Sequence, residues 1–125
     1  MKGYTADIEK ETKKNSNFRK VLFTAPNSQL VVMSLKPGED IGSEVHEEHD
    51  QFIRVEEGSG KAVLGRTEVK IKDDWAVVIP AGVKHNIVNT SKKKMMKLYT
   101  IYSPPEHPKG TVHKSKAQAL ASENH

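Results

Sequence analysis

Hydrophobic positions along the chain occur in short runs that turn-forming residues separate. The densest run lies between Gln29 and Lys36, is rich in valine and leucine, and is followed by Pro37-Gly38. Similar runs follow at 51–56, 61–64, 67–71, 75–79, 84–89 and 95–102. Runs this short, with no helical stretch between them, predict the strands of a β-sandwich or β-barrel.

Two of these runs carry a more specific prediction. Residues 61–64 and 67–71 flank Gly65-Arg66, and glycine in the first central position favours a type II′ hairpin turn. Residues 75–79 resemble a buried strand that stops at Pro80. We expect five of the larger side chains to be core or interface residues: Phe52, Trp75, Ile79, Leu98 and Ile101.

The pattern changes after Tyr102. The segment 103–110 contains three prolines, which remove backbone donors and fix φ, so it is not expected to form regular structure. Further on, Ser115 and Gln118 have the spacing of a capping box before Ala119 and Leu120, which predicts a short C-terminal helix. We therefore expect one domain over 1–125, with its core at about 18–102 and a tail with a short helix at 103–125.

Composition and charge narrow the class of protein. The chain has 125 residues, the size of one domain, and no cysteine, which excludes disulfides and thiolate metal sites. No apolar run approaches the roughly 20 residues that span a bilayer, and the N-terminus lacks a signal-peptide pattern, so we expect a cytoplasmic protein without a membrane partner. The net charge is +4, but its densest cluster, Lys92–Lys94, lies in an apparent turn without aromatic neighbours. Nucleic-acid binding is therefore not expected.

Two segments carry the chemical signal. In the second, Pro80, Gly82, His85 and Asn89 are spaced as in the second sequence motif of the cupin family. The leading glycine of that motif is Asp74 here, a residue that also suits a turn.

The first segment reproduces every interval of the first cupin motif. Gly38, five spacers, Glu44-Val45-His46, four spacers, Gln51, six spacers and Gly58 follow one another. Glu44 stands where cupins have their first histidine, and Gln51 stands where they have a glutamate. The chain thus resembles a small single-domain cupin, and this resemblance implies an all-β double-stranded β-helix, the jelly-roll or cupin barrel, with the short C-terminal helix appended.

The resemblance implies a metal site formed by His46, His85, Glu44 and Gln51. Residues 44 and 46 are two apart, so on a strand both side chains point to one face, which in a small barrel is the cavity. Imidazole, carboxylate and amide oxygen together suit Mn, Fe(II), Co, Ni or Zn. We expect one divalent transition-metal ion per subunit, and partial occupancy, because glutamine is a weaker ligand than glutamate.

Other polar residues receive weaker assignments. His49 is three residues from His46 and is expected on the opposite face of a regular strand, unless the acidic loop 47–50 bends. The C-terminal tail is expected to be exposed. The remaining candidates are Glu48, His49 and Tyr99 as acid–base groups near the barrel mouth, Lys84 as a phosphate contact, and His107 and His113 as tail histidines that reach the site only if the tail folds over the opening.

The cupin resemblance does not select one activity, because the family includes dioxygenases, sugar isomerases, decarboxylases, storage proteins and sensor domains. One hypothesis is a metal-dependent enzyme, isomerase-like or dioxygenase-like, acting on a polar small molecule. The other is a non-enzymatic module that binds or senses a small ligand or a metal. Small cupins commonly pair through a sheet face, so a homodimer is the expected state.

Overall fold

The computed structural model describes residues 2–123, which form two β-sheets and two short helices. The elements in chain order are α1 (Ile8–Lys14), β1 (Arg19–Thr24), β2 (Gln29–Leu35), β3 (Asp50–Glu57), β4 (Ser59–Leu64), β5 (Thr67–Lys72), β6 (Ala76–Ile79), β7 (His85–Asn89), β8 (Met96–Ser103), β9 (Val112–His113) and α2 (Lys116–Glu123). A six-stranded sheet has the order β6-β3-β8-β2-β1-β9, and a three-stranded sheet has the order β5-β4-β7. All strand pairs are antiparallel.

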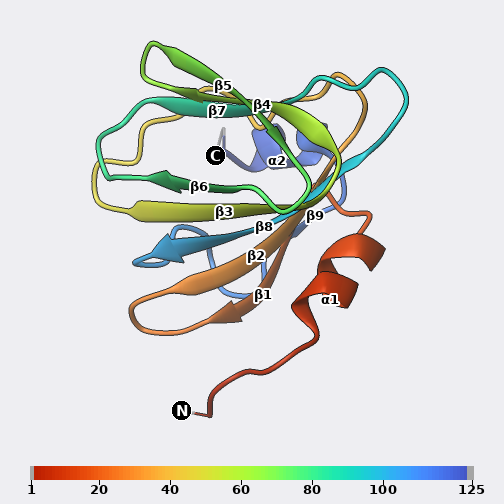
Figure 1. Cartoon of the computed structure of the whole chain (residues 1–125). Coiled ribbons are helices and arrows are strands. Elements are labelled where there is room, and N and C mark those ends of the chain that lie inside the picture. Colours follow the sequence, from red (N-terminus) through yellow and green to blue (C-terminus); the bar gives the residue numbers. More distant parts are fainter. Residues whose placement is uncertain (1, 124–125) are drawn as a thin grey trace.

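The two sheets face one another (Figure 1), and Ala119 of α2 belongs to the hydrophobic core. Strand β8 shows how the sequence produces this arrangement. Its residues alternate between buried and half-buried, with Met96, Leu98, Thr100 and Tyr102 turned to the interior. The two-layered, antiparallel architecture confirms the predicted fold class.

Turn chemistry follows the sequence closely. Gly65 has a φ of 61°, as the first central residue of a type II′ turn requires. Asp74, which replaces the motif glycine, has a φ of 71° and therefore keeps the left-handed conformation that glycine would adopt there. Its carboxylate also contacts Arg54 Nη2 at 3.0 Å. The departure from the motif thus leaves the backbone unchanged.

Strand β6 is less buried than its sequence suggested. Its residues alternate between exposed and buried, and Val78 is 64% exposed. The reason is its position at the edge of the six-stranded sheet, where only one face meets the core. Trp75, just before the strand, is 43% exposed and is not a core residue, whereas Ile79 and Leu98 are core residues as expected.

Helix α1 is an element that the hydrophobic pattern did not reveal. Asp7 caps it by accepting a hydrogen bond from Lys10 N at 3.2 Å, and acidic residues in its first turn and lysines in its last suit the helix dipole. It packs on the outer side of the six-stranded sheet, against β8, β3 and β2. The one buried side chain of this helix is Thr12, so an apolar stripe is missing and only the capping signal was available.

The C-terminal tail packs onto the barrel, so the expectation of an exposed tail is only partly correct: many of its side chains are exposed, but Ala119 is buried. After an irregular segment, β9 pairs with β1, placing His113 opposite Arg19. Helix α2 begins after Ser115, whose hydroxyl accepts from Gln118 N at 3.1 Å as the capping pattern predicted, and Ala119 joins the hydrophobic core. The tail therefore closes one end of the barrel, next to the loop that carries Glu44 and His46.

Candidate metal centre

Backbone pairing brings the two motif segments together. Glu44 and His85 exchange both of their backbone hydrogen bonds at 2.9 Å, and Gly82 N donates to His46 O at 2.9 Å. Directly paired residues in an antiparallel bridge project their side chains to the same face. Glu44 lies in an isolated bridge rather than in the regular strand that we expected, yet the bridge has the same effect on its side chain.

Three of the predicted ligands converge. One ligand atom from each of Glu44, His46 and His85 lies within 4.8 Å of the others, and all three side chains are buried or half-buried. The His46 and His85 rings are 5.3 Å apart between centroids. A carboxylate and two imidazoles are a common ligand set for divalent transition metals.

The orientation of the two imidazoles fits metal binding. His85 Nδ1 lies 2.9 Å from Val83 O, to which it donates, so Nε2 is left with its lone pair toward the interior. His46 Nε2 is buried and lies 2.8 Å from Glu44 Oε2. It makes no hydrogen bond to any described residue, because Glu44 Oε2 does not lie along the direction of an N–H bond from Nε2. Two atoms that bind one ion at right angles, each at about 2.1 Å, lie roughly 3 Å apart. The distance between His46 Nε2 and Glu44 Oε2 is therefore the distance expected between two ligand atoms of one ion.

A second carboxylate supports His46 from its other side. Glu106 Oε2 lies 3.3 Å from His46 Nδ1 and 3.0 Å from His49 Nε2. His49 stands at 5.9 Å from the His46 ring, because the chain bends at 47–48, so the expectation that it faces away from His46 is wrong. Carboxylates in this position orient metal-binding histidines and increase their basicity. No local sequence pattern marks Glu106, which lies among the prolines of the tail.

Gln51 is placed in the interior, on β3. It is 3% exposed, and its Nε2 donates to Thr100 Oγ1 at 3.0 Å. Its carbonyl oxygen Oε1 is buried and has no hydrogen-bond partner among the described residues. A buried acceptor without a partner is costly, so an added ion or water is the natural partner for this oxygen. Gln51 as a fourth ligand remains a prediction.

The electrostatics of the metal-free site couple Glu44 and His46. Burial alone would raise the pKa of Glu44, but the adjacent His46 and the charge of Arg19 hold it below its usual range. The Glu44 carboxylate in turn raises the pKa of His46, against the opposing effect of burial. Each group thus favours the charged form of the other, and a metal ion would compete with the proton of His46.

Two further interior residues, Tyr102 and Arg19, were not predicted, whereas His107 was a candidate only if the tail folded over the opening. Tyr102 is fully buried with its ring edge-on to His46 at 5.8 Å, and burial raises the pKa of its hydroxyl. His107 packs edge-on against Tyr102 at 5.2 Å, and burial lowers its pKa to about 3. Arg19 is 2% exposed and points into the same interior. A single arginine or tyrosine in a strand carries no signal of its function.

Three weaker candidates lie away from the centre. Tyr99 is on the outer face of β8, where it packs near Phe52 at 6.2 Å, because it is an odd number of residues from the inward Tyr102. Glu48 and Lys84 are exposed. Within the described residues, neither side chain forms a hydrogen bond or an ion pair with Glu44, His46 or His85, the ligand triad. The assignment of Tyr99 to the barrel mouth is therefore wrong.

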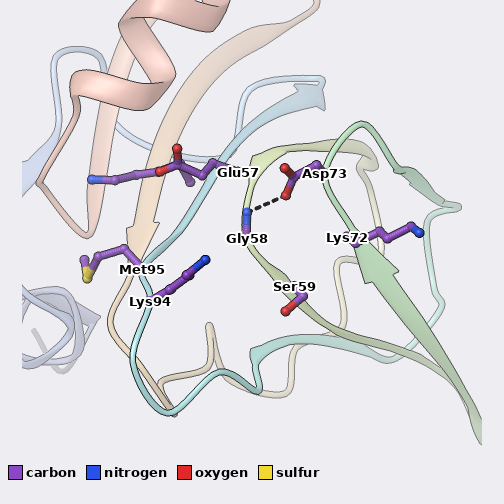
Figure 2. Close-up of a pocket in the computed structure, with 8 residues that line it drawn as sticks. Glu57, Gly58, Ser59, Lys72, Asp73, Lys94 and Met95 are labelled. Carbon is purple, nitrogen blue, oxygen red and sulfur yellow. Dashed lines mark hydrogen bonds between the residues drawn. The ribbon is translucent and has the colours of Figure 1, made fainter.

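A larger hollow in the described surface lies away from these residues. A groove of about 850 Å³ lies beside the turn at Gly58, whose N donates to Asp73 Oδ1 at 2.8 Å (Figure 2). Lysines 72, 94 and 97 border it. Because the groove lies where β3 and β7 end, whereas His85 begins β7, it is at the opposite end of the sheets from the triad.

Comparisons with known proteins agree with the fold. The cupin domain family matches residues 31–102. The uncharacterized protein YrkC of Bacillus subtilis is 44% identical over 98% of this chain and 69% of its own length, and the uncharacterized protein L612 of Acanthamoeba polyphaga mimivirus is 44% identical over 95% of this chain and 76% of its own. The crystal structure of BH2720 from Bacillus halodurans has a TM-score of 0.94 and 46% identity, covering 96% of this chain and 95% of that one. Neither helix of the described chain has the length and apolarity needed to cross a membrane.

Proposed function

This chain belongs to the cupin family, and we propose that it binds one divalent transition-metal ion between Glu44, His46 and His85 and presents that ion to a polar small molecule. The observation that carries the proposal is the convergence of three ligand atoms within 4.8 Å. His85 Nδ1 donates to Val83 O and His46 Nε2 has no hydrogen-bond partner among the described residues, which supports the proposal because it leaves Nε2 of both histidines available to an ion.

An enzymatic role is favoured by the number of ligands. Catalytic metal sites keep an open position, whereas structural sites are closed. Glu44, His46 and His85 are three protein ligands, and even with Gln51 as a fourth an ion that takes six ligands has open positions. Bound here, Mn, Fe, Co, Ni or Zn would act as a Lewis acid or an oxygen-activating centre. Glu106 and His49 lie beside His46 and form the acid–base pair nearest to the centre. We therefore propose a metal-dependent enzyme.

The second candidate, a module that binds or senses without turnover, is favoured by the covering tail. Residues 104–123 fold over the end of the barrel, with Ala119 2% exposed in the core. Such a cover restricts the access that turnover needs. The two candidates therefore differ in whether the metal keeps an exchangeable position.

Elemental analysis of the untagged protein tests the shared claim. We expect up to one transition-metal ion per chain, rising to one after incubation with Mn²⁺ or Zn²⁺ and falling by at least tenfold in His85→Ala. The control is His113→Ala, a histidine of β9 outside the triad, which should bind as the native chain does. Metal binding that survives His85→Ala would contradict the proposal.

Water proton relaxation of the Mn²⁺-loaded protein separates the two candidates. An open position admits exchanging water and increases the relaxation rate well above that of a fully coordinated ion. A strong increase supports the enzyme, and its absence supports the closed binding module.

A further inference from the structure

Arg19 is a buried charge with few partners. It is 2% exposed on β1, and its Nε is buried without a hydrogen bond to any described residue. Its guanidinium group lies 5.3 Å from the centre of the Phe18 ring, and Nη1 lies 3.4 Å from Nδ1 of His113. Neither neighbour is an anion.

Within residues 2–123, no carboxylate oxygen lies within 4.0 Å of this guanidinium group. Glu44 shares the interior with it but is turned toward His46. Lys116, the other cation near this end of the barrel, is paired with Asp40. Buried charges in proteins are normally paired, because leaving one uncompensated costs several kcal/mol in order of magnitude. Among the described residues Arg19 therefore forms no direct ion pair, although its charge acts on Glu44 across the interior.

A cavity lies where that counterion would fit. It has a volume of about 110 Å³, and both Arg19 and the metal ligand Glu44 are in its wall, with Ser43 and α2 residues around them. A second hollow of about 410 Å³ also has Arg19 in its wall, together with His107 and His113, and opens beside β9. Since Glu123 lines both hollows as well, they adjoin at Arg19 and Glu123.

The size of the inner cavity limits its occupant. A volume of about 110 Å³ accommodates roughly three or four water molecules at about 30 Å³ each, which corresponds to a compact molecule of a few heavy atoms. A phosphosugar exceeds this volume. The planar guanidinium fork matches a carboxylate in shape and charge.

We propose that this chain binds a small carboxylic acid in the cavity between Arg19 and Glu44, with Arg19 as the counterion of the carboxylate. The inference rests on the proposed function in one respect: the rest of the acid would extend toward the metal ion held by Glu44, His46 and His85. It names the class of ligand that the metal centre takes, and it assigns Arg19 as a binding residue.

The test is calorimetric titration of the metal-loaded full chain with malonate, with its neutral analogue malonamide and with inorganic phosphate. We expect malonate to bind, malonamide not to bind, and phosphate to bind at least tenfold more weakly. In Arg19→Met malonate affinity should fall by roughly 10- to 100-fold, since a hydrogen-bonded charge pair is lost. Arg54→Met, which removes a surface arginine, should leave affinity unchanged.

The metal content and melting temperature of the same samples show whether each Arg19 variant is folded and metal-loaded. Arg19→Met should retain its metal and show an equal or higher melting temperature, because a buried charge without a direct ion-pair partner is removed. If that variant fails to fold, Arg19→Lys keeps the positive charge but lacks the planar guanidinium group, and its affinity for malonate should be at least fivefold weaker. Unchanged malonate affinity in a folded Arg19 variant would overturn the inference, as would phosphate binding more tightly than malonate. Metal bound without malonate binding would overturn it while leaving the proposed function intact.

Discussion

The candidate metal centre depends on single residues that hold its two histidines in place. Glycine, proline and asparagine surround His46 and His85 at fixed intervals, which is why these two histidines could be predicted. The structure explains those intervals: Gly82, with a φ of 86°, donates to the carbonyl of His46, and Asn89 is fully buried and contacts the carbonyls of Leu35 and Lys94. Glu106 and Arg19 could not be predicted, because nothing local marks a side chain that reaches the interior from a distant segment.

Glu106 should act on metal affinity through His46. Glu106→Gln keeps the shape of the side chain but removes the charge that orients the imidazole. We expect metal affinity to fall by roughly 10- to 100-fold, as measured by competition with a chromophoric chelator. Glu48→Gln, an exposed residue of the neighbouring loop, is the matched control. Equal affinities in the two variants would show that Glu106 does not support the ligand.

Gln51 should be a metal ligand of modest strength. Gln51→Glu places an anionic oxygen at the buried, unpartnered position, and we expect tighter metal binding by about tenfold, since a carboxylate is the stronger ligand. Gln118→Glu, on exposed α2, should have no effect in the same chelator competition. If Gln51→Glu binds metal no more tightly, the Gln51 side chain does not reach the ion.

At the level of elements, the strands could be predicted from the sequence, whereas the docking of the C-terminal tail could not. The alternation in β8 and the turn at Gly65 follow directly from local sequence. The tail was expected to be exposed because its prolines exclude regular structure. Its docking depends instead on distant partners: Gln29 accepts from His107 N at 3.0 Å and donates to His107 O at 2.8 Å. Such long-range contacts leave no periodic trace in the sequence.

Docking of the tail should make the protein sensitive to acid. His107 titrates near 6.5 when unfolded and near 3 when buried, so the unfolded state binds the extra proton between these values. Stability is therefore complete above about pH 6.5 and is lost as the pH falls toward 3, by about 2 kcal/mol at pH 5 from this group.

Urea denaturation of the metal-free protein and of His107→Phe tests this directly. The variant should lose about 2 kcal/mol less than the native chain between about pH 7 and pH 5. Other groups titrate equally in both proteins and cancel in the comparison. Equal losses in the two proteins would contradict the burial of a neutral His107.

On the scale of the whole molecule, part of the outer face of the six-stranded sheet, near its β6 edge, is apolar. Phe52 is the cross-strand neighbour of both Val78 and Ile101, so the three side chains share this face, and Tyr99 adjoins them. Val78 is 64% exposed. We propose that a second copy of the chain covers this face, giving the homodimer that the cupin resemblance implies.

Sedimentation velocity should reveal this dimer and its dependence on the face. Val78→Glu introduces a charge at the centre of the contact and should yield a folded monomer, with the dimer dissociation constant raised at least 100-fold. Val69→Glu, on exposed β5 of the other sheet, should remain dimeric. A Val78→Glu protein that remains dimeric would exclude this face as the interface.

The central claim is that Glu44, His46 and His85 hold a metal ion, and anomalous diffraction from a crystal grown with Mn²⁺ or Zn²⁺ tests it most directly. We predict one strong anomalous peak per chain, about 2.0–2.2 Å from a Glu44 carboxylate oxygen and from Nε2 of both histidines. A peak bound elsewhere, or no peak in protein exposed to excess metal, would contradict the account.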